Sequence, residues 1–315
     1  MRVVVTGGAG FIGSNLVSAL ASAGHVVGVI DDLSTGKREN LQPDVWFREL
    51  DILDPEMGSV VAAFAPDAIV HLAAQASVSV SLRNPARDRA VNTDGTRHVA
   101  RAAREAGATR VISASSAAVY GEPDEALLPL DEGAPKAPAN PYGISKLAAE
   151  TALAEELLGT GVDFASFRFA NVYGPRQDAA GEGGVVALFC ARMHEGASPI
   201  IYGTGEQTRD FIFVGDIVGA IIAALGCGAP LGTATGDVSA YNISTGAETS
   251  VNALLGSLRD ASGYAGSVDV QPARDGDVDR SSLSPSKAAR VFGWSASEPL
   301  PSGLATTWRW YAGQA

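Results

Sequence analysis

The feature that most constrains the fold is a glycine-rich turn near the N-terminus. The β-branched run Arg2–Thr6 ends at Gly7, and Gly10 and Gly13 follow before the helical pattern Asn15–Ala23. In this setting the first glycine permits a tight turn, the second lets the backbone approach a pyrophosphate, and the third allows close helix–strand packing. The start of the helix adds N–H donors and a positive dipole end for phosphates. The turn therefore predicts a βαβ unit that binds a dinucleotide.

Short apolar runs alternate with helical patterns along the first half of the chain. The runs that are typical of strands are Arg2–Thr6, Val26–Ile30, Trp46–Glu49, Ala68–Leu72, Arg110–Ser113 and Val162–Arg168. The helical patterns between the later runs are Met57–Phe64, Ala86–Ala106 and Tyr142–Leu158. Because the strand runs are almost continuously apolar, they indicate a parallel sheet with both faces covered. Right-handed crossovers then give a doubly wound α/β fold of the Rossmann type.

The pattern changes after Asn171, where residues 172–210 are rich in glycine and proline. A return to the sheet is indicated by Phe211–Val214, the helical Asp216–Leu225 and Tyr241–Ile243. A further helix is expected at Val251–Ala261. We therefore expect a dinucleotide-binding Rossmann domain of residues 1–171 plus 211–248, and a smaller α/β substrate-binding lobe of residues 172–210 plus 249–315.

Composition and charge exclude several classes of protein. Hydrophobic residues make up 46% of the 315 residues and charged residues 18%, which supports a large core and argues against global disorder. The net charge of −12 argues against a nucleic-acid or membrane-surface partner, because such partners select a basic face. The longest apolar run, near Ile217–Leu225, is too short to span a bilayer. The N-terminus opens into a strand pattern rather than a signal peptide, so we expect a cytoplasmic protein.

The cysteines and histidines give no sign of a metal or a disulfide. Metal-ligand spacing is lacking among the four histidines, which are His25, His71, His98 and His194. We therefore expect neither a structural nor a catalytic metal. Cys190 and Cys227 lie in apolar stretches and are interpreted as small core residues rather than a reactive or bonded pair.

Asp31, at the end of the second predicted strand, indicates the type of dinucleotide. It follows Gly13 by 18 residues, where a carboxylate can bind the diol of the adenosine ribose. A carboxylate there repels a 2′-phosphate, and Asp32 beside it offers no compensating charge, so the sequence favours NAD over NADP. Lys37 and Arg38, further along the loop, leave NADP open as an alternative.

Two further strand ends are suited to the cofactor. Asp51 and Ile52 follow the third predicted strand, where the carboxylate can accept a hydrogen bond from the exocyclic amine of adenine. Leu72, Ala73 and Ala74 follow the fourth strand and are suited to close passage of the dinucleotide.

Tyr142 and Lys146 are the candidate catalytic pair. They are four residues apart in a helical pattern, so they share one face of the helix. A free tyrosine has a pKa of about 10. A neighbouring ammonium and an oxidised nicotinamide would together lower that pKa and make the phenolate usable as a base. Ser116 lies just beyond the fifth predicted strand, where its hydroxyl can face the same reacting oxygen.

Eight blocks of sequence carry a resemblance to a known superfamily. The blocks are Thr6–Gly13, Asp31–Gly36, His71–Gln75, Ser115–Gly121, Pro141–Lys146, Asn171–Arg176, Gly203–Phe211 and Arg274–Val278. Through them the sequence resembles the extended short-chain dehydrogenase/reductase superfamily and, within it, the UDP-glucose (UDP-galactose) 4-epimerases. The late blocks are the more specific ones, because they belong to members that act on nucleotide sugars.

The resemblance implies a role for each matching residue. Tyr142 is the implied base, Lys146 orients the cofactor ribose and tunes the tyrosine, and Ser116 bonds the sugar 4-hydroxyl. Further cofactor contacts are implied for Gly7, Gly10, Phe11, Ile12, Gly13, Asp31, Asp32, Ser34, Thr35, Gly36, Asp51, Ile52, Leu72, Ala73, Ala74, Gln75 and Asn92. Substrate contacts are implied for Ser77, Asn171, Val186, Tyr202, Gln207, Arg209, Arg274 and Asp277. Arg209 and Arg274 suit a diphosphate chemically as well, because a guanidinium can bind two oxygens at once.

The implied reaction is the 4-epimerisation of a UDP-hexose with NAD as cofactor. Tyr142 removes the 4-hydroxyl proton while C4 gives its hydride to NAD, and the 4-keto sugar turns over and takes the hydride back on its other face. The cofactor ends as it began, so we expect it to be held tightly. A homodimer through the helices around residues 86–106 and 142–158 is implied as well.

The sequence also bears on neighbouring activities. Ala117 and Ala118 stand where nucleotide-sugar 4,6-dehydratases usually carry an acidic pair, which disfavours a dehydratase. UDP-glucuronate 4-epimerases and decarboxylases stay open, since no residue that recognises a carboxylate at C5 is assigned. A non-catalytic dinucleotide-binding protein is disfavoured because Tyr142 and Lys146 are both present.

Ser281 bears on the size of the substrate. It lies four residues after Asp277 and matches a position where a tyrosine narrows the sugar pocket in some family members. A small residue there would admit an N-acetyl group at C2. We therefore expect activity on UDP-GlcNAc and UDP-GalNAc as well as on UDP-glucose and UDP-galactose.

Overall fold

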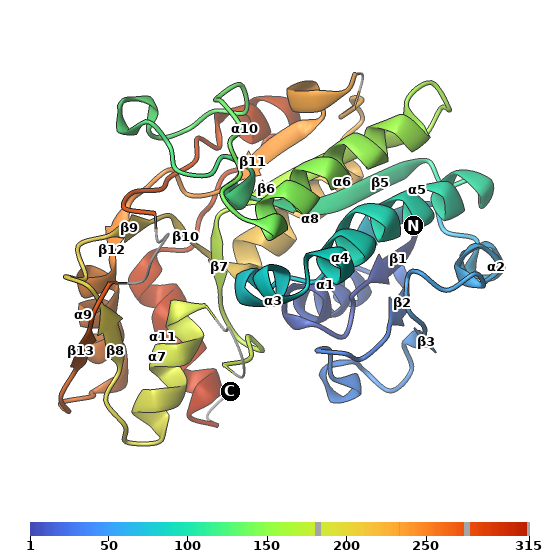
Figure 1. Ribbon diagram of the computed structural model, residues 1–315. Helices are drawn as coiled ribbons and strands as arrows, with labels where there is room; N and C mark the ends of the chain where they lie inside the picture. The colour runs from blue at the N-terminus through green and yellow to red at the C-terminus, as the bar shows by residue number, and fades with distance from the viewer. Residues whose placement is uncertain (180–183, 233, 274–277, 314–315) are drawn as a thin grey trace.

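A seven-stranded parallel sheet forms the centre of the larger part of the molecule (Figure 1). The computed structural model describes residues 1–179, 184–232, 234–273 and 278–313. In spatial order the strands are β11 (Ala240–Ile243), β6 (Asp163–Phe169), β5 (Arg110–Ser116), β4 (Ala68–His71), β1 (Arg2–Thr6), β2 (Val26–Asp31) and β3 (Trp46–Glu49). The predicted doubly wound fold is confirmed. The strand order reverses between β1 and β4, and the carboxyl ends of strands at such a reversal form the usual ligand crevice.

The two faces of the sheet are covered by different helices. One face is covered by α1 (Phe11–Ser22), α8 (Val214–Gly226) and α10 (Ser286–Phe292). The other is covered by α2 (Met57–Phe64), α5 (Gly95–Glu105) and α6 (Pro141–Leu157). Along β1, Val3 and Val5 belong to the first core and Val4 to the second. This alternation explains why the strands are apolar at consecutive positions.

A third core lies in a smaller lobe, at the left of Figure 1. Its helices are α7 (Val185–His194), α9 (Val251–Ser262) and α11 (Leu300–Tyr311). Its strands pair as β8 (Ile200–Tyr202) with β13 (Asp269–Gln271) and β9 (Thr208–Arg209) with β12 (Thr249–Ser250). Phe189, Leu254 and Leu304 bring the three helices together in this core. Helix α10 comes late in the chain but packs through Ala288 on the main sheet.

The prediction that Phe211–Val214 returns to the main sheet is wrong. The strand β10 (Phe211–Phe213) pairs instead with β7 (Asn171–Tyr173) in a separate parallel ribbon, and Val214 already begins α8. The Phe213 ring lies 5.7 Å from the Tyr173 ring, between their centroids. The apolar side chains of this segment therefore pack within a separate ribbon. This ribbon lies between the main sheet and the lobe (Figure 1).

The helix predicted over Ala86–Ala106 is interrupted. Helix α4 (Pro85–Arg89), which follows α3 (Val78–Arg83), leads into a π-helical turn at Ala90–Asp94 before α5 begins. Such π-turns occur often at functional sites. Here the turn carries Asn92, which exchanges hydrogen bonds with the backbone of Gln75 after β4.

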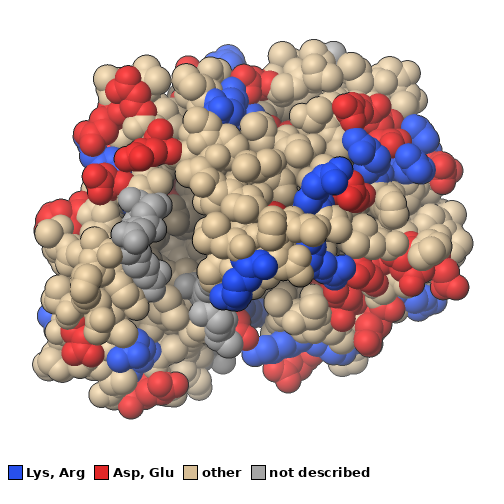
Figure 2. Space-filling model, in the orientation of Figure 1, with Lys and Arg blue, Asp and Glu red and all other residues tan. Residues whose placement is uncertain are grey.

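Basic and acidic side chains are interspersed over the face of the molecule in Figure 2. Within the described ranges, no helix combines the length and apolar character needed to cross a membrane. Both cysteines are free thiols, as predicted; Cys190 is buried in the core of the lobe and Cys227 packs at the edge of the first core.

Candidate active site

The glycine turn between β1 and α1 leaves no room for larger side chains. Gly7 has a φ of +69°, and a Cβ there would lie 2.6 Å from the backbone nitrogen of Ala73. A Cβ on Gly13 would lie 2.1 Å from the carbonyl oxygen of Gly7. Gly10 caps α1 without a side-chain hydrogen bond, so the N–H groups of the first turn, Phe11–Gly13, are open to a phosphate. The geometry of the turn suits a dinucleotide.

Asp31 connects the glycine turn to the loop after β2. Its carboxylate accepts hydrogen bonds from the N–H groups of Ala9 and Leu33, both at 2.9 Å. Burial raises the pKa of Asp31, and the two backbone donors act against that rise. Each oxygen keeps a second lone pair for a ribose hydroxyl. A Cβ on Gly36 would lie 2.8 Å from Asp31 Oδ1, so a glycine lets the loop pass close to the carboxylate.

The loops after β2 and β3 carry the next predicted cofactor residues. These are Asp32, Ser34, Thr35, Asp51 and Ile52. The Ser34 hydroxyl donates to Asp32 Oδ1 at 2.6 Å, which stiffens the loop beside Asp31. Asp51 pairs with Arg87 at 3.2 Å and Ile52 is buried. Both loops therefore lie at the carboxyl edge of the sheet, on the β2 side of the reversal.

The segment after β4 lies on the other side of the glycine turn. It holds Leu72, Ala73, Ala74 and Gln75. The N–H of Leu72 donates to the carbonyl oxygen of Thr6 at 3.0 Å, which holds the segment against the end of β1. Asn92 accepts from the N–H of Gln75 at 2.9 Å and donates to its carbonyl oxygen at 3.0 Å. The structure thus brings Asn92 to the other predicted cofactor residues.

Tyr142, Lys146 and Ser116 come together at the start of α6, as the sequence predicts. Asn140 caps this helix by accepting from the N–H of Gly143 at 2.9 Å. The Tyr142 hydroxyl lies near the Ser116 side chain and interacts with it. Lys146 Nζ donates to the carbonyl oxygen of Ala114 at 3.0 Å and lies 6.0 Å from the centroid of the Tyr142 ring. An acid–base group and a fixed cation are therefore neighbours.

The protein alone does not lower the pKa of the tyrosine. Burial raises the pKa of Tyr142. The interaction with Ser116 lowers this pKa, but its effect is the smaller of the two. Burial also lowers the pKa of Lys146 to about 8, against the nearby charges of Asp88 and Glu150. The expected lowering of the tyrosine pKa therefore depends on the positive charge of an oxidised nicotinamide beside it.

Most of the predicted substrate residues that the structure describes lie in the β7–β10 ribbon or in the lobe. Ser77 caps α3, Asn171 begins β7, Val186 is buried in α7 and Tyr202 ends β8. Gln207 Nε2 donates to the carbonyl oxygen of Tyr202 at 2.9 Å, so these two predicted residues meet.

The remaining predicted substrate residues fall near β9 or outside the described ranges. Arg209 lies in β9 and donates to the carbonyl oxygen of Thr208 at 2.8 Å. Arg274 and Asp277 lie outside the described residues. Ser281 is partly buried and is followed by the buried Ser282.

Comparison with known proteins decides the family. The sequence pattern of the NAD dependent epimerase/dehydratase family matches residues 3–243. The chain belongs to this family. A protein of Mycolicibacterium smegmatis named UDP-glucose 4-epimerase is 41% identical over 313 residues, which cover 98% of this chain and 97% of that protein.

Two solved structures of relatives match this member of the epimerase/dehydratase family over almost its whole length. The UDP-glucose 4-epimerase of Thermotoga maritima, solved with UDP-glucose, is 39% identical with a TM-score of 0.93 and 99% coverage of both chains. The UDP-glucose 4-epimerase of Thermus thermophilus, solved in complex with NAD, is 38% identical with a TM-score of 0.90 and 100% coverage of both. Sequence and fold therefore agree on the family.

Three polar groups of this epimerase/dehydratase chain are not among the predicted site residues. One is Asp210, next to Arg209; it is buried and accepts from the hydroxyl of Thr245 at 2.7 Å and the N–H of Gly246 at 3.0 Å. It ties the β9–β10 segment to the loop after β11. The second is Asp88. The third is Arg168 with its buried ion pairs, which contact the helix that carries Lys146.

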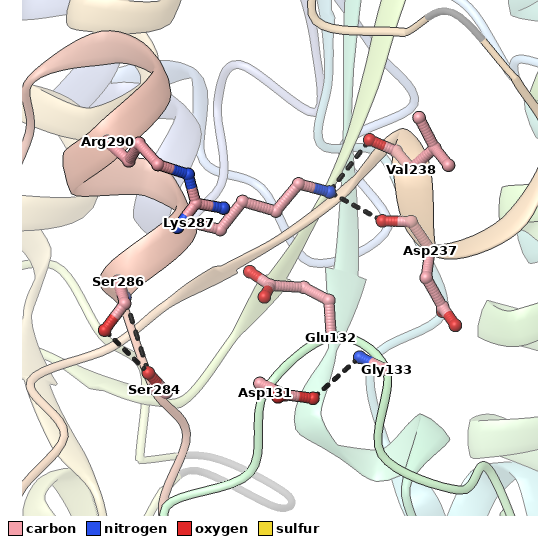
Figure 3. A pocket seen from close by; sticks show the side chains of 9 residues that line it. All are labelled: Asp131, Glu132, Gly133, Asp237, Val238, Ser284, Ser286, Lys287 and Arg290. Atoms are coloured by element: carbon pink, nitrogen blue, oxygen red, sulfur yellow. Dashed lines mark hydrogen bonds between the residues drawn. The ribbon is translucent and has the colours of Figure 1, made fainter.

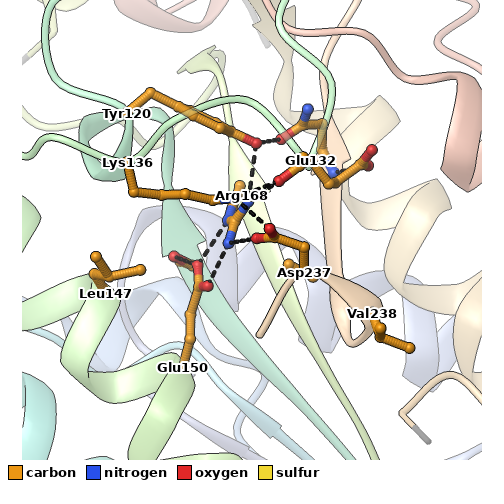
Figure 4. Close-up of polar contacts among 12 residues, drawn as sticks. Tyr120, Glu132, Lys136, Leu147, Glu150, Arg168, Asp237 and Val238 are labelled. Atoms are coloured by element: carbon orange, nitrogen blue, oxygen red, sulfur yellow. Dashed lines mark hydrogen bonds and ion pairs between the residues drawn. The ribbon is translucent and has the colours of Figure 1, made fainter. Parts of the chain in front are cut away.

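The ion network centres on Arg168 of β6, which is fully buried (Figure 4). Its guanidinium donates twice to Glu150 of α6, at 2.9 and 2.7 Å, and once to Asp237 at 3.0 Å. It also donates to the Tyr120 hydroxyl at 3.0 Å. Glu150 lies one helical turn after Lys146, so the network fixes the helix that carries the catalytic pair. Its one signal in the sequence is that spacing.

A surface pocket opens beside this network, between the loop at residues 131–133 and α10 (Figure 3). Lys287 points from α10 toward the turn before β11, where it donates to the carbonyl oxygen of Val238 at 2.8 Å. That cation is already bonded to the backbone. Within the described ranges, none of the predicted cofactor or substrate residues lines this pocket.

Proposed function

We propose that the chain is a UDP-hexose 4-epimerase that retains bound NAD. The proposal rests on one observation, the grouping of Tyr142 with Ser116 and with Lys146, whose Nζ lies 6.0 Å from the centroid of the Tyr142 ring. The chain also has a glycine turn that fits a dinucleotide, and its end-to-end relatives include proteins named UDP-glucose 4-epimerase. The proposed substrates are UDP-glucose and UDP-galactose, together with UDP-GlcNAc and UDP-GalNAc.

The proposed mechanism assigns proton transfer to Tyr142. When bound, NAD supplies a reversible hydride acceptor for C4 of the sugar. Tyr142 takes the proton of the 4-hydroxyl and later returns it, first as general base and then as general acid. Ser116 bonds the same sugar oxygen and holds it against the tyrosine. Lys146 donates to the cofactor ribose and keeps a positive charge beside the phenolate.

We also propose that the two parts of the chain bind different ligands. Residues 1–171 plus 211–248 hold the cofactor, and residues 172–210 plus 249–315 hold the UDP group. The separate core of α7, α9 and α11 supports this division, and α10 is an exception because it packs on the main sheet. Asn171, Gln207 and Arg209 are the proposed UDP contacts within the described ranges.

We propose a homodimer formed through the outer side of α5 and α6. Within one protomer these helices are joined by Arg97 and Glu155 at 2.6 Å and by Arg101 and Glu156 at 2.9 Å. Ile144 of α6 is 55% exposed, which leaves an apolar side chain to bury. We expect sedimentation equilibrium to give roughly twice the chain mass of 32.2 kDa. A single species of the chain mass would contradict the dimer.

Ser281→Tyr tests the proposed breadth of substrates. The larger side chain is expected to occupy the space of a C2 N-acetyl group and to spare the smaller hexoses. We expect the ratio of kcat/KM for UDP-GlcNAc to that for UDP-glucose to fall about tenfold or more. Steady-state rates with both substrates give the ratio. Ser286→Tyr, at an exposed position five residues away, serves as the control. An unchanged ratio in the Ser281 variant contradicts the assignment.

An epimer-resolving assay without added cofactor tests the proposed function. UDP-glucose, UDP-GlcNAc and UDP-glucuronate are each incubated with the purified protein, and the products are separated by chromatography or NMR. Formation of UDP-galactose from UDP-glucose is the expected result. Conversion of UDP-glucuronate alone favours the glucuronate activities instead, and protein that needs added NADPH contradicts a retained NAD.

A further inference from the structure

Asp88 is a fully buried carboxylate beside the proposed catalytic pair. It lies on α4, and its Oδ1 accepts from Gln75 Nε2 at 2.6 Å and from Asn92 Nδ2 at 3.3 Å. Its Oδ2 has no hydrogen-bond partner in the part of the chain that the structure describes. Burying a carboxylate costs free energy unless the group is paired with a cation or hydrogen-bonded, so an oxygen without a partner needs an explanation. The mechanism assigned above does not use it.

A chain of hydrogen bonds joins Asp88 to the backbone of the catalytic tyrosine. Asn92 Nδ2, which donates to Asp88, also donates to Ser145 Oγ at 3.0 Å. The Ser145 hydroxyl in turn donates to the carbonyl oxygen of Tyr142 at 3.0 Å. On the other side, the Gln75 side chain that Asp88 accepts from belongs to the segment after β4. One carboxylate therefore orients both the first turn of α6 and a cofactor loop.

Three other ionisable groups surround Lys146, and their charges define the place of Asp88. Glu150 faces Lys146 from α6, but both of its oxygens are bound by Arg168. His71 faces Lys146 from β4, and burial lowers its pKa to about 3, so it is neutral. Asp88 raises the pKa of Lys146 and also raises that of Tyr142. Among the neighbouring acidic groups, Asp88 is therefore the one whose charge affects the pKa of both Tyr142 and Lys146.

We propose that Asp88 is a positioning residue that holds Gln75 and Asn92 in place and supplies a negative charge beside Lys146 and Tyr142. The inference rests on the proposed function for its catalytic meaning. The dipole of α4 explains an acidic residue at this position less well than these hydrogen bonds do. Helix α4 has only five residues, and the Asp88 carboxylate is bonded to side chains outside it. The role is electrostatic and geometric, and Asp88 itself touches neither sugar nor cofactor in the proposal.

Titration of Tyr142 in the Asp88→Asn variant tests the proposal without relying on turnover. The ultraviolet difference spectrum between each protein and its Tyr142→Phe counterpart isolates the ionisation of this tyrosine. Lys146, whose pKa is about 8, is already neutral where Tyr142 titrates, so only the direct effect of Asp88 on the tyrosine counts. Loss of the negative charge is therefore expected to lower the Tyr142 midpoint by about one pH unit, a tenfold change in the ionisation equilibrium. Asp94→Asn is the control, since Asp94 is an exposed neighbour on the π-turn, 4.0 Å from Arg89. That variant should titrate as the unmodified protein does.

The outcomes separate this inference from the proposed function. A Tyr142 midpoint that is unchanged in folded, NAD-containing Asp88→Asn overturns the electrostatic role. If the asparagine variant does not fold, Asp88→Glu keeps the charge, so it should titrate within about 0.3 pH unit of the unmodified protein; a larger shift overturns the proposal. A shifted midpoint in a protein that epimerises no UDP-sugar supports the role of Asp88 while contradicting the proposed reaction.

Discussion

Tyr142→Phe is expected to lower kcat for epimerisation by about a hundredfold to ten-thousandfold, which is the usual contribution of general acid–base catalysis. The substitution removes only the hydroxyl, which lies near Ser116, so the ring keeps its place at the start of α6. We expect bound NAD and the melting temperature to change little. Steady-state rates with UDP-glucose and the nucleotide released on denaturation give the two readings.

Tyr264→Phe provides a matched control for the catalytic tyrosine. Its hydroxyl donates to backbone carbonyl oxygens in the lobe, far from α6 in sequence. This variant should keep its kcat within about twofold, since no acid–base role is removed. If Tyr142→Phe retains more than a tenth of the activity, another group takes the proton and the assignment of the base is wrong.

Glu150→Ala is expected to lower the free energy of unfolding by about 3–5 kcal/mol, because it leaves a buried guanidinium without its main partner. Arg168 is fully buried and donates to both carboxylate oxygens of Glu150. Its remaining partners include Asp237, which is partly exposed, and the Tyr120 hydroxyl. Chemical denaturation followed by circular dichroism, with NAD content recorded, measures the change.

Two further variants distinguish the effect of breaking the buried Glu150–Arg168 pair from the effect of removing any glutamate of α6. Glu155→Ala removes an exposed partner of Arg97 on the same helix and should cost less than about 1 kcal/mol. The double variant Glu150→Leu/Arg168→Met replaces both charges by apolar groups and should be less destabilised than Glu150→Ala alone. Equal losses for Glu150→Ala and Glu155→Ala would contradict the central place of the ion network.

The main sheet and the catalytic pair could be predicted because their signals are local. The bounds of Arg2–Thr6, Trp46–Glu49 and Met57–Phe64 match the structure, since apolar runs and periods mark each element directly. Tyr142 and Lys146 are separated by one helical turn, so the helix alone brings them together.

The polar environment of the pair could not be predicted in the same way. Asp88 meets Gln75 across 13 residues and Arg168 meets Glu150 across 18, and in each case the partners lie on different elements, so no helix or strand period connects them. Helix α7 (Val185–His194) lies in a glycine- and proline-rich segment for which the sequence pattern predicts no helix, and its apolar face is explained only by the core of the lobe. Such contacts arise from tertiary packing.

Label retention at C4 tests the central claim, that a hydride leaves and returns to the same carbon. UDP-glucose deuterated at C4 is incubated with the protein in ordinary water without added cofactor, and the product is analysed by NMR and mass spectrometry. Our account predicts UDP-galactose that retains the deuterium at C4, because the hydride never exchanges with solvent. UDP-galactose with hydrogen at C4 would contradict hydride transfer, since it would show that the carbon had exchanged a proton with water.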